Sequence, residues 1–382
     1  MLSAIQTVNE ALGSLSIKAQ KSAAAFKQSS QLKVQPLQFS GALDQFEREE
    51  LAVALGDRFA PNVRLKELLA LPREQGDPIL RDLAILSPSA CGGAADELLP
   101  PVSHRGVVFF QDQHDIVPED IGHLALRLGE LAGKPEDSTL HIHPTQELTE
   151  TGLPLGKIDS QPDRDGRQIS FAGKSFTSRE WHTDVAFEPR PSLYTILQIH
   201  TLPRIGGDTL WSSNYAAYDR LTPTYQKFLE GLTGLNDAER FRIQARENGF
   251  KLRTEPRGSP HNAGDAFQAS HPLIRTNPVT GLRALYVNPT FTKQINELSF
   301  DESRSVLEYL FRVQIENHEN HVKYRWSKYD VAIWDNRVVN HLATFDFAGP
   351  RAGDRAVVVG EAPYFDPASI SQAEYLAAQE KA

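Results

Sequence analysis

The sequence predicts a mainly β fold with helical insertions, of the α+β class and arranged as an antiparallel sandwich or barrel. The first observation is a set of short runs rich in apolar, β-branched and aromatic residues and bounded by turn-forming residues. They lie at residues 106–110, 192–202, 272–275, 283–288, 330–334 and 356–360. The second observation is that the helical patterns among them are few, at residues 118–132, 215–232 and 300–317. This order is typical of antiparallel sheets rather than of a doubly wound parallel sheet.

The chain of 382 residues is predicted to have two parts. Residues 1–100 form a helical and irregular N-terminal extension in which residues suited to chemistry are sparse, and residues 101–382 form the main domain. Within that domain, residues 145–180 are polar and rich in Gly, Pro, Asp and Ser. An irregular stretch of this length in a compact domain is typical of a functional lid or of disorder. We expect a lid there.

Composition excludes several classes of protein. Hydrophobic residues make up 40% and charged residues 23%, as in globular proteins. Forty basic against 49 acidic residues give a net charge of −9, so we expect no nucleic-acid partner. The single cysteine, Cys91, excludes an intramolecular disulfide and thiolate-rich metal sites.

No stretch approaches the roughly 18–20 apolar residues that cross a bilayer, so we expect no membrane partner and a cytoplasmic protein. Residues 1–30 are rich in Ser, Ala, Lys and Gln, a composition that a weak mitochondrial transit peptide would share.

A candidate metal site combines His182, Asp184 and His341. On a strand, the two residues of a His-x-Asp pair point to the same face, and His341 follows a distant apolar run. Two histidines and one carboxylate form the facial triad of non-haem iron(II) oxygenases, which leaves three coordination positions for cosubstrate and dioxygen. An isolated His-x-Asp is weak evidence, and the same groups bind zinc or manganese as well.

Two arginines follow the triad at a short distance. Arg351 and Arg355 lie ten and fourteen residues after His341. An arginine in bidentate contact is the usual anchor for a carboxylate such as that of 2-oxoglutarate. The alternative is that both arginines face solvent and pair with Asp346 and Asp354.

Several longer motifs resemble, in order, the taurine/2,4-dichlorophenoxyacetate dioxygenase (TauD/TfdA) family, and within it the fungal sulfonate dioxygenases. The resemblance covers roughly residues 103–365. It rests on Trp181-His-Thr-Asp-Val185, Gly206-Gly-Asp-Thr-Leu-Trp211, His271-Pro-Leu-Ile-Arg-Thr276, Ala284-Leu-Tyr-Val-Asn288, Trp334-Asp-Asn-Arg337, His341 and the Arg351/Arg355 pair.

The resemblance implies a double-stranded β-helix (a cupin-like jelly roll) with the metal at the open end of the barrel. It assigns His182, Asp184 and His341 to iron(II), and Thr209 and Arg351 to the distal carboxylate of 2-oxoglutarate. The residues that it places around the substrate are His143, Val185, Phe187, Phe291 and Arg355. Gln146 replaces a family tyrosine that binds the amine of taurine, so we expect a retained anion end and a rebuilt amine end.

The function expected from these residues is an iron(II)- and 2-oxoglutarate-dependent dioxygenase. With dioxygen, it would hydroxylate a small sulfonate or carboxylate and release succinate and carbon dioxide. Asp184 favours hydroxylation over halogenation, because halogenases leave that coordination position open. One alternative is an oxygenase that hydroxylates, desaturates or cyclises an amino acid or aryloxy acid in a biosynthetic pathway. Another is a jelly-roll protein that binds metal without catalysis. Related enzymes form dimers or tetramers, but no residue of this sequence indicates an interface, so a homo-oligomer (dimer or tetramer) and a monomer both stay open.

Overall fold

A computed structural model describes residues 36–85, 102–145, 152–161 and 176–379, all within one compact unit, Pro36–Ala382. The predicted boundary at residue 100 lies outside the described residues. The described residues on its N-terminal side contribute two helices and two short strands to the same unit.

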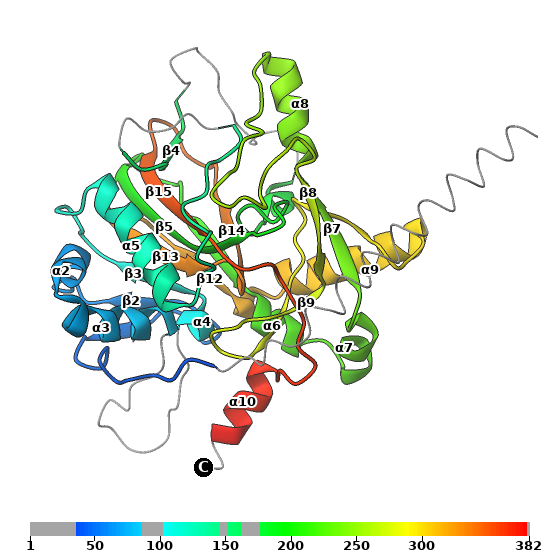
Figure 1. Ribbon diagram of the computed structural model, residues 1–382, viewed down its shortest axis with the longest axis horizontal. Helices are drawn as coiled ribbons and strands as arrows, with labels where there is room; N and C mark the ends of the chain where they lie inside the picture. Colours follow the sequence, from blue (N-terminus) through cyan, green and yellow to red (C-terminus); the bar gives the residue numbers. More distant parts are fainter. Residues whose placement is uncertain (1–35, 86–101, 146–151, 162–175, 380–382) are drawn as a thin grey trace, which may run out of the picture. The chain divides into compact units, whose positions relative to one another are not determined.

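Four antiparallel or mixed sheets organise the structure (Figure 1). The largest has seven strands in the order β1-β2-β3-β13-β5-β15-β4, of which only β2 and β3 pair in parallel. Its strands are β1 (Arg48–Glu50), β2 (Asp57–Phe59), β3 (Val107–Phe110), β13 (Val331–Asp335), β5 (Ser192–Thr201), β15 (Ala352–Val359) and β4 (Gly156–Asp159).

Three smaller sheets complete the set. The first has the order β12 (His321–Tyr324), β6 (Thr209–Ser213) and β14 (Val339–Ala343). The second has the order β11 (Thr292–Ile295), β7 (Thr233–Asp237) and β8 (Gln268–Pro272), and the third joins β10 (Arg283–Leu285) to β9 (Ile274–Thr276).

The helices are insertions between strands, as predicted. They are α2 (Leu65–Ala70), α3 (Arg73–Ile85), α4 (Val102–Arg105), α5 (Pro118–Leu131), α6 (Asn214–Asp219), α7 (Pro223–Leu229), α8 (Glu239–Asn248), α9 (Phe300–Ile315) and α10 (Gln372–Gln379), with 3-10 turns at η1 (Thr177–Glu180) and η2 (His318–Asn320). No helix of the described residues is long and apolar enough to span a membrane.

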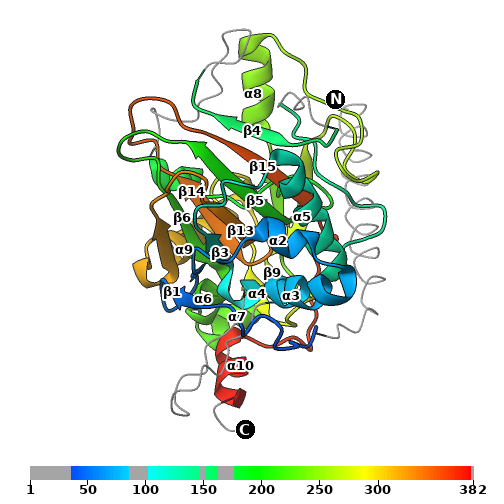
Figure 2. The same cartoon turned by 90° about the vertical axis from the view of Figure 1, so that its left-hand side faces the viewer.

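The central strands of the large sheet are buried on both faces, and β3 shows why such a strand has an apolar sequence without alternation. Val107 and Phe109 pack in the core between the large sheet and the β12-β6-β14 sheet. Val108 and Phe110 point the other way, into the core beneath α2, α3 and α5. Figure 2 shows these helices in front of the sheet. Because successive side chains of a strand face opposite sides, a strand covered on both faces is apolar throughout.

Each predicted β run contains or overlaps a strand, although residues 272–275 are divided between β8 and β9. The single helical pattern predicted at 215–232 is wrong, since the segment forms two helices, α6 and α7. Pro223 has no amide hydrogen to continue the first helix, and the Thr222 side chain accepts a hydrogen bond from the amide of Tyr225 to begin the second.

The predicted lid is described only in part. Residues 146–151 and 162–175, which include Gln146, lie outside the described residues. The described part contains β4, which pairs with β15, and η1, which ends one residue before Trp181. The expectation of an irregular segment is therefore wrong at β4.

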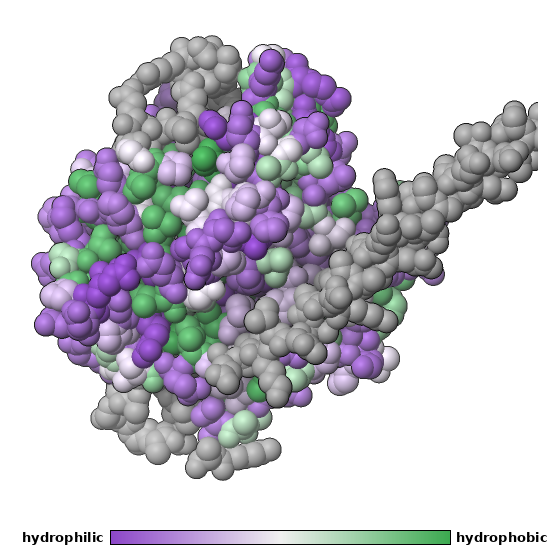
Figure 3. Space-filling view, viewed as in Figure 1, coloured by the Kyte–Doolittle hydropathy of each residue, from purple (hydrophilic) through white to green (hydrophobic). Residues whose placement is uncertain are grey.

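Helix α8 has a largely polar sequence, Glu-Arg-Phe-Arg-Ile-Gln-Ala-Arg-Glu-Asn. Its buried residues are Phe241 and Ala245, and the part of Figure 3 where α8 lies is coloured mainly hydrophilic.

Candidate metal centre and substrate site

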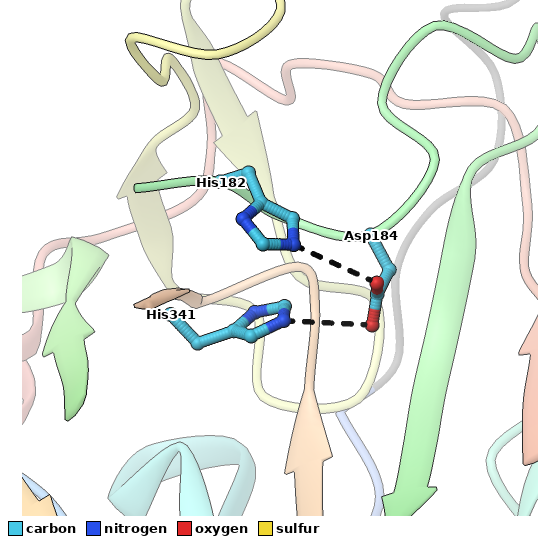
Figure 4. Close-up of side chains that lie close together, drawn as sticks. All are labelled: His182, Asp184 and His341. Atoms are coloured by element: carbon cyan, nitrogen blue, oxygen red, sulfur yellow. Dashed lines mark ion pairs between the residues drawn. The ribbon is translucent and has the colours of Figure 1, made fainter. Parts of the chain in front are cut away.

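The backbone brings the two candidate histidine ligands together. His182 and His341 form an isolated antiparallel bridge, with amide-to-carbonyl distances of 3.0 and 2.7 Å in the two directions. His341 belongs to β14, an edge strand of the β12-β6-β14 sheet, and Asp184 follows His182 by two residues. Figure 4 shows the three side chains converging on one region.

The donor atoms of these side chains are close enough to share one ion. His182 Nε2 lies 4.0 Å from Asp184 Oδ1, and His341 Nε2 lies 3.9 Å from Asp184 Oδ2. One ligand atom from each residue lies within 4.8 Å of the other two. Donors bound to one ion at about 2.0–2.2 Å stand roughly 3 Å apart, so small side-chain rotations complete such a site.

Hydrogen bonds fix the orientation of His182. Its Nδ1 lies 2.7 Å from the carbonyl oxygen of Glu180, to which it donates when the proton is on Nδ1. This leaves Nε2 free to bind a metal, as is usual for histidine ligands.

Asp184 is held by four neighbouring groups. Oδ2 accepts from the Thr195 hydroxyl at 2.7 Å, and Oδ1 accepts from Arg355 Nη1 at 3.1 Å. The Asp184 amide donates to Asn336 at 3.1 Å, and the carbonyl accepts from Ser192 at 2.7 Å. The carboxylate therefore stays in one orientation.

The site favours the protonation states that bind metal. Burial favours neutral Asp184, but the charge of Arg355, the two neighbouring imidazoles and the hydrogen bond from Thr195 together outweigh this effect and hold the pKa of Asp184 well below its usual 3.8. Burial lowers the pKa of His341 to about 3 and that of His182 below 6.5. Metals bind neutral imidazole and ionised carboxylate.

Arg351 and Thr209, predicted to hold 2-oxoglutarate, lie together. Arg351 Nη2 donates to the Thr209 hydroxyl at 3.4 Å, and Nε donates to the carbonyl of Gly207 at 2.9 Å. Arg351 is 5% exposed, and no carboxylate of the described residues lies within ion-pair distance of it. Burial lowers its pKa to about 10. A buried guanidinium without a carboxylate partner is suited to a carboxylate ligand.

The alternative of two solvent-facing arginines is wrong. Asp354 lies near His200 at 3.6 Å, and Asp346 accepts the amide of Gly207 at 3.0 Å. Arg355 lies in β15, which pairs with β5 inside the sheet, and Arg351 directly precedes that strand. The Arg351 residue is 5% exposed and the Arg355 side chain 13% exposed.

His143 lies within electrostatic reach of Arg355 and the metal site. Burial, with a further contribution from Arg355, lowers the pKa of His143 well below 6.5, so the ring is neutral. Its Nδ1 accepts from the amide of Thr145 at 3.3 Å, which places the ring proton on Nε2.

The other predicted substrate residues form an apolar cluster beside the triad. Phe187 and Phe291 have ring centroids 5.3 Å apart, and Phe291 lies 6.2 Å from the His182 ring. Val185 joins the same cluster and adopts a φ of 51°, which is rare for a β-branched residue.

Sequence analysis missed several residues that support this region. Phe241 belongs to the aromatic cluster, and Thr195 and Asn336 hydrogen-bond to Asp184. Glu188 forms a buried network with Arg257 at 2.5 and 2.8 Å and with His141 at 3.1 Å. Asn336 lies inside the quoted Trp334-Asp-Asn-Arg337 motif, which was a signal for it; Thr195 and Arg257 lie in no such motif.

Comparison with known proteins agrees with this site. A family model described as "Taurine catabolism dioxygenase TauD, TfdA family" matches residues 81–359. The alpha-ketoglutarate-dependent dioxygenase esdpJ of Penicillium shearii is 36% identical over 382 residues, which cover 90% of this chain and 97% of that protein. The alpha-ketoglutarate-dependent sulfonate dioxygenase of Saccharomyces cerevisiae is 31% identical over 287 residues, with 74% of this chain and 65% of that protein covered.

A solved structure has the same fold. The crystal structure of a taurine dioxygenase from Burkholderia xenovorans gives a TM-score of 0.61 at 23% identity, covering 85% of this chain and 92% of that chain. The predicted double-stranded β-helix is thereby confirmed.

Proposed function

The chain belongs to the taurine catabolism dioxygenase TauD/TfdA family and is an alpha-ketoglutarate (2-oxoglutarate)-dependent dioxygenase, and from this premise we propose that it oxidises an organic acid larger than taurine. The acid's anionic group would be bound by Arg355 and His143, and its apolar part by the phenylalanine cluster. The metal would be iron(II), held by His182, Asp184 and His341. The donor set of two imidazoles and one carboxylate supports this choice.

One observation carries the proposal: the Arg355 guanidinium lies 3.1 Å from the metal-ligating Asp184. An anion that Arg355 binds is consequently held beside the metal. Phe187 and Phe291 border the same region and are suited to an aryl or other apolar group.

Among the acids expected from the sequence, an amino acid or aryloxy acid of a biosynthetic pathway is the better supported alternative. The Penicillium relative is matched over nearly its whole length, and its name does not mention a sulfonate substrate. The yeast sulfonate dioxygenase is less similar and is matched over a smaller part of its length. A small sulfonate is the second candidate, since Arg355 and neutral His143 suit either anion.

Each residue has a defined task in the proposed reaction. Iron(II), 2-oxoglutarate and dioxygen together supply the oxidising power that removes a hydrogen atom from an unactivated carbon, with release of succinate and carbon dioxide. Arg351 and Thr209 hold the distal carboxylate of the cosubstrate. His143 donates from Nε2 to the substrate anion, and Arg355 fixes the distance between that anion and Asp184. The buried phenylalanines keep water away from the reacting carbon.

The test begins with an anaerobic titration of the protein with iron(II) and 2-oxoglutarate, in which a weak visible charge-transfer band is expected. A succinate-coupled screen then compares aryloxy acids, amino acids and alkanesulfonates. Substrate-dependent succinate with the first two classes supports the proposal. A response to alkanesulfonates alone favours the second candidate, and metal binding without succinate under any condition contradicts the assigned reaction.

The two arginines provide matched variants. Arg355→Ala is expected to lower kcat/KM for the acid by at least about 30-fold, because loss of a buried charge partner costs about 2 kcal/mol or more. The KM for 2-oxoglutarate should stay near that of the parent protein. Arg351→Ala should show the opposite pattern. If Arg355→Ala impaired kcat/KM for the acid and the KM for 2-oxoglutarate to the same extent, the two arginines would be assigned wrongly.

A further inference from the structure

The first turn of α8 contacts both the metal site and the substrate region through two successive residues. They are Arg240, which is partly exposed, and Phe241, which is buried. Neither belongs to the motifs that define the family resemblance.

Arg240 reaches the metal site through Glu180. Its Nη1 and Nη2 donate to the two carboxylate oxygens of Glu180 at 2.6 and 3.1 Å, a bidentate geometry that fixes the carboxylate in direction as well as in position. The carbonyl oxygen of the same Glu180 lies 2.7 Å from His182 Nδ1. Arg240 thus holds the residue that orients a metal ligand.

Phe241 reaches the substrate region directly. Its ring centroid lies 5.0 Å from His143, 5.5 Å from Phe187 and 6.1 Å from Phe291. These three residues are those proposed to bind the anionic and apolar parts of the substrate. The Phe241 side chain closes the apolar cluster on the side of α8.

Resting on the proposed function, we propose that Arg240 is a positioning residue for His182 and that Phe241 determines how large an apolar group the substrate carries. The first turn of α8 supplies both. Substrate range within this scaffold is therefore set partly by a helix whose exterior is polar.

The role of Arg240 is tested without turnover. Cobalt(II) is titrated into the protein in the presence of N-oxalylglycine, an unreactive analogue of 2-oxoglutarate, while the visible ligand-field absorption is followed. Arg240→Gln and Glu180→Gln are each expected to raise the cobalt dissociation constant about tenfold and to shift the absorption, because loss of outer partners weakens metal binding to this degree. Arg240→Lys should recover part of the affinity.

The chain offers a matched control in the same helix. Arg242 pairs with Asp237 at 2.6 Å, and its side chain is 34% exposed against 33% for Arg240. Arg242→Gln removes an ion pair of similar exposure in the same helix, and neither Arg242 nor Asp237 hydrogen-bonds to Glu180 or His182 among the described residues. The cobalt affinity of this variant should therefore stay within twofold of that of the parent protein. Equal affinities and spectra for Arg240→Gln and Arg242→Gln would overturn the positioning role.

The role of Phe241 is tested with ω-phenylalkanoic acids of increasing chain length and the succinate assay. Phe241→Ala should raise the kcat/KM ratio of longer to shorter acids by at least about tenfold, since one methylene in an apolar pocket changes discrimination by this amount. Phe241→Trp should shift the ratio toward shorter acids. Phe228→Ala, at an exposed phenylalanine of α7, should leave the ratio unchanged.

The outcomes separate the inference from the function on which it rests. The same order of acids in the parent, Phe241→Ala and Phe241→Trp proteins would overturn the specificity role alone. No acid-dependent succinate in any protein, including the parent, would contradict the proposed function and the specificity role together. The cobalt titration would still decide the role of Arg240.

Discussion

Asp184 receives hydrogen bonds at both carboxylate oxygens from residues that are themselves fixed. Thr195 donates its hydroxyl proton to Asp184 and accepts from Asn336 Nδ2 at 2.8 Å. Asn336 Oδ1 in turn accepts from the indole of Trp334 at 3.1 Å and from the Asp184 amide. The ligand is thus tied to the buried centre of β13 and β5, and its geometry depends on side chains that never touch the metal.

Thr195→Val is expected to weaken metal binding while leaving the fold intact. The substitution keeps the side-chain shape but removes the proton donor to Asp184 Oδ2, and loss of such a partner costs about 10- to 100-fold in metal affinity. Cobalt(II) titration measures the change. Thr195→Ser, which keeps the hydroxyl, should bind within a few fold of the parent protein, and an equally weak Thr195→Ser would speak against the hydrogen bond as the cause.

Single site residues could be predicted from the sequence where the side-chain type itself indicates the chemistry, as it does for metal-binding histidines and carboxylate-binding arginines. The triad, Thr209 and the two arginines were predicted from donor type and motif. The structure places the three triad residues together, Arg351 beside Thr209 and Arg355 beside Asp184. Thr195 and Phe241 were not predicted, because a threonine inside an apolar strand and a phenylalanine inside a polar helix have no local signature. Their importance comes from long-range packing alone.

Among the elements, β15 is important for the site because Arg351 and Arg355 stand on either side of its first register shift. The register between β15 and β5 shifts between Ala352 and Gly353. A Cβ on Gly353 would stand 2.2 Å from the carbonyl oxygen of Gln198, so only glycine fits against that backbone.

Gly353→Ala is expected to destabilise the fold and disturb both arginines. Overpacking costs typically about 1–3 kcal/mol, and here the neighbour is backbone that cannot turn away. The expected result is a lower denaturation midpoint together with weaker binding of N-oxalylglycine. Gly152→Ala, where a Cβ meets nothing within 4 Å, is the control. An unchanged midpoint for Gly353→Ala would mean that β15 can move away from β5 without cost.

A helix or strand could be predicted from the sequence where most of its own side chains are buried. Strands β3, β5 and β13 are continuous apolar runs because helices and a second sheet cover both faces. Strand β4 was missed because it is an edge strand with alternating exposure and a polar sequence, Gly-Lys-Ile-Asp. Helix α8 was missed for a similar reason, since two buried residues in ten give little periodic signal.

On the scale of the whole molecule, several buried histidines affect how stability depends on pH. Burial lowers the pKa of His104 to about 3 and that of His271 to about 4. In the folded state both imidazoles therefore stay neutral at pH values below 6.5, at which the imidazoles of the unfolded chain bind a proton. Below that pH the unfolded chain binds more protons, so stability falls as pH falls, until the folded-state pKa is reached.

His104→Phe is expected to flatten this dependence between about pH 3 and 6.5. His104 packs at 4.8 Å from Tyr375, and its buried Nδ1 has no hydrogen-bond partner among the described residues, so an apolar ring suits the site. Each such histidine contributes a slope of about 1.4 kcal/mol per pH unit in this window. Urea denaturation of the metal-free protein at a series of pH values measures it, and parallel curves for parent and variant would count against a neutral buried His104.

The backbone bridge between His182 and His341 has one more consequence. Because main-chain hydrogen bonds hold His182 beside His341, the backbone of the site should be the same with and without metal, and only small side-chain rotations should accompany binding. A preassembled site does little to reject competitors, and affinities for divalent ions follow the Irving–Williams order, in which iron ranks low. Occupancy in a cell would then be governed by ion supply, and mismetallation by zinc or copper becomes the natural way for this protein to lose activity while staying folded.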